Sequence, residues 1–157
     1  MSLLELPLGP LERAFIASLH RLEPQAPEAV LLAGALCCEA LASGDVCLSL
    51  ARLAGKRPWP DHAFSLPPLD TWRAQLAASS LIGVPGDYAP LILDGDRLYL
   101  ARYQAYEQQL AEQLLARAAD VPVIDEAQLS ESLTRLFVFN QQSPDWQRLA
   151  AAQAVRR

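Results

Sequence analysis

Ala29-Val30-Leu31-Leu32-Ala33-Gly34-Ala35-Leu36-Cys37-Cys38 is the most apolar run of the chain, and it lies between Glu28 and Glu39. Pro27 suits the first turn of a helix and Ser43-Gly44 suits its end, so we expect a helix from Pro27 to about Ala42. Because this helix is apolar nearly all round, we predict that it is the central helix of the core. The run of about 10 residues is too short to cross a membrane, which takes about 20.

The composition is that of an ordinary domain with one hydrophobic core. The chain has 157 residues, of which 52% are hydrophobic. A formal net charge of −5 and a pI near 5.0 argue against a surface built mainly to hold a nucleic-acid backbone. Cys37, Cys38 and Cys47 are an odd number of cysteines, which indicates buried thiols in a reducing compartment. The N-terminus lacks the basic region of a signal peptide, so we expect a cytoplasmic protein without a membrane partner.

Two amphipathic helices and a Pro-rich segment are expected around the central helix. Apolar spacing predicts a helix over residues 11–22 and a short one over 70–79, in which Trp72 and Leu76 share one face. The Pro-rich segment 58–68 carries two aromatic side chains, which favours packing on the surface of the core.

The clearest β signal is an Asp-Gly turn between two apolar runs. Pro90-Leu91-Ile92-Leu93, Asp94-Gly95-Asp96 and Arg97-Leu98-Tyr99-Leu100 follow one another, which predicts a hairpin over residues 90–101. Residues 45–50 fit either a short strand or the start of a helix, and residues 80–86 are predicted to be a loop. The predicted fold is therefore mainly α, with about six to seven helices and one small β-hairpin.

Two further helices are expected directly after the hairpin. The first covers residues 101–118 and carries an apolar stripe of Tyr103, Tyr106, Leu110, Leu114 and Ala118. The second covers residues 125–137, with Asp125 as N-cap and Gln128 in a capping-box position. Its predicted buried face consists of Leu129, Leu133, Leu136 and Phe137.

The last stretch has the residues of a helix start. Ser143 is placed as N-cap, Pro144 in the first turn and Asp145 at the positive end of the helix dipole. Strong helix formers then continue to Arg157, with no glycine or proline after them. We therefore expect the sequence to be a piece of a longer protein whose chemistry lies downstream.

The residues that carry chemistry do not form a self-contained active site. His20 and His62 are widely separated, and no metal-binding spacing of Cys, His, Asp and Glu is present. Cys37 and Cys38 could bind a soft metal with Cys47 or His20, but adjacent side chains on a helix point about 100° apart. We therefore interpret the two thiols as small buried hydrophobes, and His20 as a cation at a helix C-terminus.

No phosphate loop or cation loop is predicted either. Gly83-Val84-Pro85-Gly86 lacks the Lys-Ser/Thr that follows a phosphate loop, and Asp94-Gly95-Asp96 is interpreted as a solvated turn. The sequence therefore predicts no catalytic residue, no metal site and no complete cofactor site within these 157 residues.

Three stretches occur in an order and at a spacing that match a known family. They are residues 44–53 (GDVCLSLARL), 90–103 (PLILDGDRLYLARY) and 145–152 (DWQRLAAA). Together they resemble the N-terminal region of RecD, the alpha chain of exodeoxyribonuclease V in the RecBCD enzyme. The resemblance covers essentially the whole chain.

The resemblance implies a parent chain that is an ATP-dependent, 5′ to 3′ DNA helicase subunit in double-strand break repair and recombination. It implies RecB and RecC as partners, duplex DNA ends reached through the assembled complex, and ATP and Mg as the cofactors of the parent. In the family the P-loop follows shortly after the stretch that ends here. The Walker A lysine and the later helicase motifs are therefore missing, and the fragment itself is expected to be non-catalytic.

One site residue carries over from the family. Gln147 matches the glutamine that reads adenine upstream of the P-loop in such helicases. A carboxamide can donate a hydrogen bond to adenine N7 and accept one from the N6 amino group. The alternative is a solvated polar residue on an exposed helix face.

The resemblance further implies that residues 1–142 are a docking domain that contacts RecC and that residues 143–157 are the first helix of the ATPase domain. Trp59, Phe64 and Trp72 are candidate docking side chains, although they could equally seal the core. A different class of function is a winged-helix-like nucleic-acid-binding module that uses Arg97 and Arg102. The net acidity weighs against this alternative.

Overall fold

The computed structural model describes residues 3, 6–119, 123–137 and 144–156. The elements are, in chain order, α1 Pro10–Leu22, α2 Glu28–Ala42, β1 Leu48–Ser49, α3 Leu50–Leu53, α4 Leu69–Ala77, β2 Ile82–Gly83, β3 Leu91–Asp94, β4 Arg97–Leu100, α5 Ala101–Ala119, α6 Glu126–Leu136 and α7 Trp146–Arg156. Seven helices in the described residues confirm the mainly α fold. The chain divides into two compact units, residues 1–107 and 108–157. Within the described residues, no helix is long and apolar enough to cross a membrane.

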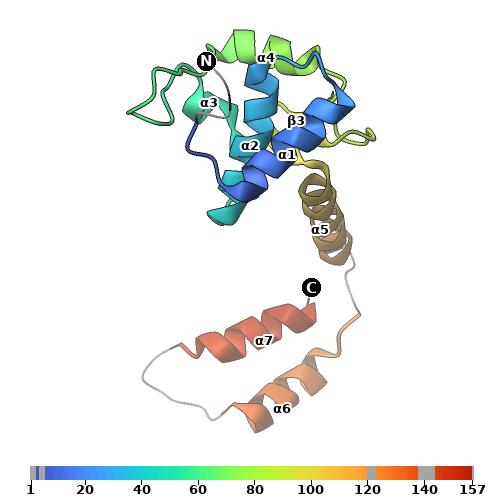
Figure 1. The fold of residues 1–157 in the computed structure, drawn as a ribbon. Coiled ribbons are helices and arrows are strands. Elements are labelled where there is room, and N and C mark those ends of the chain that lie inside the picture. Colours follow the sequence, from blue (N-terminus) through green and yellow to red (C-terminus); the bar gives the residue numbers. More distant parts are fainter. Residues whose placement is uncertain (1–2, 4–5, 120–122, 138–143, 157) are drawn as a thin grey trace. The chain divides into compact units, whose positions relative to one another are not determined.

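The first unit is built around α2. Every residue of α2 from Val30 to Cys38 is buried, so this helix is enclosed on all its sides, as predicted. The elements in contact with it are α1, α4, β1 and β4, and Figure 1 shows α1 crossing α2. Gly34 lies at the crossing, where an added Cβ would come within 2.6 Å of Leu19 Cδ1. A larger residue at this position would therefore push α1 away from α2.

Helix α4 is attached to α2 by a buried tryptophan. Trp72 is 0% exposed, and its indole Nε1 donates a hydrogen bond of 3.1 Å to the carbonyl oxygen of Ala29. Leu76, one turn later, is also buried, so the predicted shared face of this helix is confirmed. The indole therefore fills the core and also satisfies its own polar atom.

A four-stranded sheet of order β1-β4-β3-β2 contains the predicted hairpin. Strands β3 and β4 pair antiparallel, with Asp94 opposite Arg97, so Gly95 and Asp96 form the turn. Gly95 has φ +58°, and no described residue other than glycine has positive φ. This is the pattern of a type II′ turn, in which glycine occupies the first central position.

The two outer strands differ from the sequence-based expectation. Residues 80–86 are not simply a loop, because Ile82–Gly83 form β2 and pair parallel with β3. The alternatives left open for residues 45–50 both occur, since β1 (Leu48–Ser49) is followed at once by α3. Strands of two residues are too short to give an alternating pattern, and they exist here because a neighbouring strand supplies their partners.

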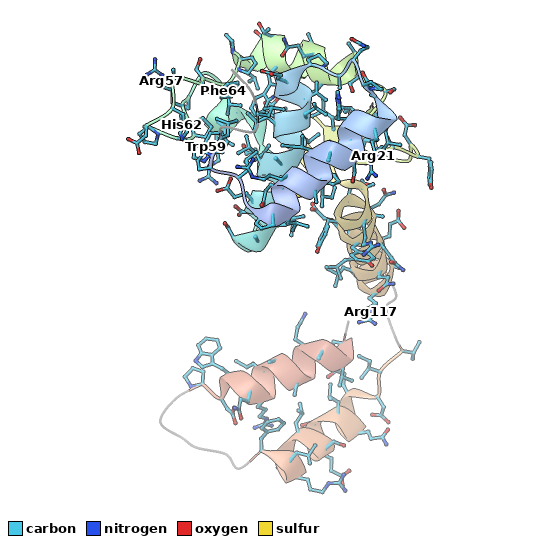
Figure 2. All side chains as sticks on the ribbon, in the orientation of Figure 1. Arg21, Arg57, Trp59, His62, Phe64 and Arg117 are labelled. Atoms are coloured by element: carbon cyan, nitrogen blue, oxygen red, sulfur yellow. The ribbon has the colours of Figure 1, made fainter. Side chains whose placement is uncertain are left out.

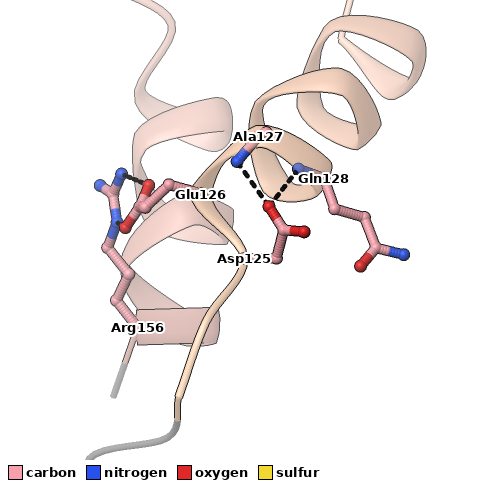
Figure 3. Close-up of polar contacts among 5 residues, drawn as sticks. All are labelled: Asp125, Glu126, Ala127, Gln128 and Arg156. Atoms are coloured by element: carbon pink, nitrogen blue, oxygen red, sulfur yellow. Dashed lines mark hydrogen bonds and ion pairs between the residues drawn. The ribbon is translucent and has the colours of Figure 1, made fainter.

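The second unit contains most of α5 together with α6 and α7. Asp125 is the N-cap of α6, as predicted, and its Oδ1 accepts hydrogen bonds from the backbone N–H groups of Ala127 and Gln128. Figure 3 shows the Gln128 carboxamide pointing away from Asp125, so the capping box is not reciprocal. Leu129 is buried, but the prediction that Leu136 is buried was wrong, because it is 70% exposed.

Helix α7 starts later than predicted. Asp145 caps the described start of the helix, because its Oδ1 accepts a hydrogen bond of 3.0 Å from the backbone N–H of Arg148. Pro144 therefore precedes the helix instead of lying in its first turn. Ser143 and Arg157 lie outside the described residues, as does the boundary predicted between residues 142 and 143, which stays a prediction.

Two thiols of α2 belong to the core of the first unit. Cys37 and Cys38 are buried, as predicted, and Cys37 Sγ donates a hydrogen bond of 3.4 Å to the carbonyl oxygen of Leu98 on β4. Burial raises the pKa of the Cys37 thiol to about 12 and that of Cys38 to about 11, because a thiolate would lose its hydration there. Both side chains are therefore neutral packing groups at physiological pH.

The raised pKa of Cys37 predicts a stability that falls in alkali. The unfolded thiol loses its proton near its ordinary pKa of 9.0, whereas the folded thiol keeps it up to about 12. The free energy of unfolding should therefore fall between these pH values, by up to about 1.4 kcal/mol per pH unit for this group. Urea unfolding at pH 8, 9 and 10 measures this slope. In a Cys37→Ala variant the slope should be smaller, and an unchanged slope would contradict the assignment.

Candidate functional site

The three aromatic side chains proposed for docking do not form an exposed group. Trp59 and Phe64 are half-buried and pack against the core of the first unit. Figure 2 shows them with His62 in the long connection between α3 and α4. Trp72 is fully buried with its N–H satisfied, so it seals the core, which is the alternative that the sequence left open, and it is no exposed docking side chain. The sequence shows that Trp72 is large and apolar. It does not show that the side chain is buried, because its hydrogen-bond partner Ala29 is distant in the chain.

An exposed apolar stripe lies instead along α5. None of the 19 residues of this helix is buried. Tyr106 and Leu110 are each 58% exposed, although these side chains lie on the predicted apolar face of the helix. The stripe consists of Tyr103, Tyr106, Leu110 and Leu114, and is called the α5 stripe below. Its spacing of three and four residues places all four side chains on one face of the helix.

The two tyrosines of the α5 stripe also contact each other. The rings of Tyr103 and Tyr106 meet edge to face, with centroids 6.2 Å apart and planes at 71°. This arrangement leaves part of each ring surface free for another apolar group. The sequence predicted the stripe itself, but spacing alone could not show that its side chains are exposed.

Gln147 lies in the first turn of α7 and is exposed. Its carboxamide makes no hydrogen bond to another described residue. Ala150, Ala151 and Ala154 follow it at helical spacing of three, four and seven residues, and this places small side chains next to it. A planar ligand could therefore come close to the helix beside the carboxamide. The amide and carbonyl groups present the donor–acceptor pair that an adenine edge needs.

Polar contacts fix the helix that carries Gln147 against α6. Arg156, at the end of α7, binds Glu126, at the start of α6, through bonds of 2.6 Å and 3.0 Å. This bidentate pair is drawn in Figure 3, and the hydrogen bond from Arg156 lowers the pKa of Glu126. The pair ties the first residue of one helix to the last described residue of the other.

The remaining candidate groups have structural surroundings. His20 lies in the last turn of α1, which fits its interpretation as a helix C-terminal residue. Asp87 Oδ2 accepts a hydrogen bond of 2.9 Å from the backbone N–H of Val84. A carboxylate therefore already occupies the glycine-containing loop that a phosphate would need. Asp96, in the hairpin turn, is paired with Arg73 at 3.3 Å. Among the described residues, no group of three or more His, Cys, Asp or Glu side chains is placed to hold a metal ion.

Comparisons with known proteins agree on one family. A family model described as RecBCD enzyme subunit RecD, N-terminal domain, matches residues 6–99. The chain is similar to a RecBCD enzyme subunit RecD of Mycolicibacterium smegmatis, with 42% identity over 130 residues, covering 78% of this chain and 22% of that protein. The subunits named RecD from two strains of Mycobacterium tuberculosis are 42% identical over 109 residues, covering 62% of this chain and 17% of theirs. The chain thus spans about a fifth of the length of the curated relatives it matches.

Proposed function

The chain belongs to the family of RecD N-terminal domains, and from that membership we propose that it is the partner-binding part of a RecD-like subunit. In this proposal the parent chain is an ATP-dependent 5′ to 3′ DNA helicase of a cytoplasmic RecBCD helicase/nuclease, which acts at duplex DNA ends in double-strand break repair and recombination. RecC and RecB are its partners. The 157 residues themselves are non-catalytic, and ATP and Mg are cofactors of the parent chain.

The observation that carries the proposal is the position of the family match. Residues 6–99 coincide with nearly all of the first unit, which has a core of its own around α2. A unit with its own core can hold a binding surface in a fixed shape without help from the motor domain. This supports a docking role for the first unit.

We place the docking contact on the α5 stripe, whose two tyrosines lie in the first unit, and commit to RecC as its occupant. The stripe offers four apolar side chains at helical spacing, two of them tyrosines, which are frequent among residues that dominate binding energy. An apolar helix face fits a groove of a partner protein, with anchors at i, i+3, i+7 and i+11. The relatives are named as subunits of a multi-subunit enzyme, which supports a protein occupant.

Replacement of one tyrosine of the α5 stripe should weaken the association with RecC. Tyr106→Glu puts a charge where apolar contact is expected, and the Kd for cognate RecC should rise at least about tenfold. Tyr88→Glu is the matched control, because Tyr88 is fully exposed in the connection between β2 and β3. Calorimetric titration of RecC with each variant measures the change, and circular dichroism checks that both variants keep their helices.

Three results would contradict the docking proposal. The first is no association between the unchanged chain and cognate RecC at micromolar concentration. The second is an equal loss of affinity in the Tyr106→Glu and Tyr88→Glu variants, which would show that the contact does not lie on α5. The third is tight, steeply salt-dependent binding of the chain to duplex DNA, which would favour the winged-helix-like alternative.

For Gln147 we propose the adenine-reading role in the parent chain. The exposed carboxamide, the small alanine side chains beside it and the capped start of α7 support this role. The phosphate-binding and Mg-binding groups belong to the part of the parent that follows.

Gln147→Ala in the parent chain should raise the KM for ATP by roughly tenfold, because the paired hydrogen bonds to the base are lost. The KM for GTP should change little, since the carboxamide pattern does not match guanine. Gln153→Ala is the matched control, the same substitution on an exposed glutamine of the same helix. Steady-state ATPase and GTPase assays measure both constants. An equal effect on ATP and GTP would show that Gln147 does not read the base.

A further inference from the structure

An open hollow of the first unit lies between helix α4 and the connection from α1 to α2. Its volume is about 790 Å³. Glu23 and Pro27 line it from the connection, and Asp70, Ala74 and Gln75 line it from α4. None of the described residues that line it carries a positive charge, whereas Glu23 and Asp70 are both acidic. The hollow therefore offers a negatively charged surface beside small apolar side chains.

One wall of the hollow contains a buried acceptor that has no donor. Gln75 lies on α4 directly before the buried Leu76, and its Oε1 atom is buried. Among the described residues, none donates a hydrogen bond to this atom. Buried polar atoms in proteins nearly always have a partner, because a group that has lost its water is destabilising without one. Gln75 Oε1 therefore indicates a donor that enters the hollow from outside the chain.

The carboxylate of Glu23 is held in one orientation at the hollow. Its Oε2 accepts hydrogen bonds of 2.7 Å from the Ser79 hydroxyl and 2.8 Å from the Ser80 hydroxyl. The bond from Ser79 is the main cause of the lowered pKa of Glu23, and the bond from Ser80 is the next. Arg73, the basic residue of α4, is paired with Asp96 at 3.3 Å instead. The hollow therefore presents a fixed, ionised carboxylate at neutral pH.

We propose that this hollow binds a guanidinium group, carried by an arginine side chain of a partner protein. A guanidinium is planar and has five N–H donors, so it can bond to Gln75 Oε1 and to the Glu23 carboxylate at once. Its faces are weakly hydrated, so they can lie against Pro27 and Ala74. An ammonium has three donors on one strongly hydrated nitrogen and would lose more hydration on entry. The site is separate from the α5 stripe and does not rest on the proposed function.

The open side of the hollow favours a side chain over a free small molecule. A small cation in an open site makes few contacts and gains little affinity from them. An arginine of a partner protein enters the hollow with its side chain, while its backbone makes further contacts outside. Its positive charge also complements a chain whose formal net charge is −5.

Titration of the 157-residue chain with the blocked tripeptide Ala-Arg-Ala, followed by nuclear magnetic resonance, tests the proposal. The amides of Glu23, Gln75 and Ser79 should shift, while those of β3 and β4 should stay in place. Citrulline in place of arginine keeps the shape of the side chain but removes its charge, so the Kd should be at least about fivefold higher. Lysine in place of arginine should raise the Kd by about threefold or more.

Gln75→Leu removes the unpaired acceptor and keeps an apolar wall. The Kd for the arginine tripeptide should rise at least about fivefold, because a charge-assisted hydrogen bond is lost. The Tm of the free chain should not fall, since the variant no longer buries an acceptor without a donor. Gln153→Leu is the matched control on an exposed glutamine of α7, and it should change neither value. Glu23→Gln is a second variant that keeps an acceptor for the Ser79 hydroxyl but removes the charge, so it should also raise the Kd.

Each of the following results overturns the proposal. No shift of the hollow amides with the arginine tripeptide means that the hollow binds no guanidinium. Equal binding of the citrulline tripeptide means that the charge is not recognised, and equal or tighter binding of the lysine tripeptide means that the site prefers an ammonium. Tighter binding of free agmatine than of the arginine tripeptide identifies a small molecule as the ligand. A lower Tm with an unchanged Kd in Gln75→Leu means that Gln75 has only a structural role.

Discussion

The burial of α2 on every side is the constraint on which the first unit depends. An α-helix normally keeps one polar face for water, but Val30 to Cys38 leave no such face. Other elements must therefore enclose the helix completely. Helix α1 can approach closely because residue 34 is glycine, α4 is joined through the Trp72 indole, and the sheet closes a further side through Leu98. Removing α1, α4 or the sheet would expose part of the apolar helix α2 to water.

The sequence predicted this centre well, because its signals are local. A continuous apolar run, an Asp-Gly turn and an N-cap aspartate each specify structure within a few residues, and α2, the hairpin and Asp125 were predicted correctly. The strand at Ile82 forms by pairing with Leu91, and the buried Trp72 bonds to Ala29. Both partners lie outside the local stretch of sequence, so no local pattern predicted these two features. Whether an apolar side chain is exposed is equally difficult to predict from a local pattern. The stripe on α5 and the face containing Leu136 were recognised as apolar, but whether an apolar face is covered depends on what packs against it.

The division into two units separates two kinds of surface. The first unit has a complete core and matches the family model over most of its length, which suits a domain that folds and binds as one body. The second unit has capped helices, a joined pair of ends and the exposed Gln147, and among its described residues Leu129 and Ala152 are the buried apolar side chains. A chain of this kind is consistent with a binding domain followed by the opening helices of a motor.

The central proposal is that cognate RecC binds through the first unit and α5 and makes no contact with α6 and α7. The most direct test compares the affinity of cognate RecC for the 157-residue chain with its affinity for a chain that ends at Ala119, the last residue of α5. The account predicts the same Kd within about twofold, because no RecC contact is lost. A loss of tenfold or more on removal of α6 and α7 would contradict it and would place the docking surface on these two helices.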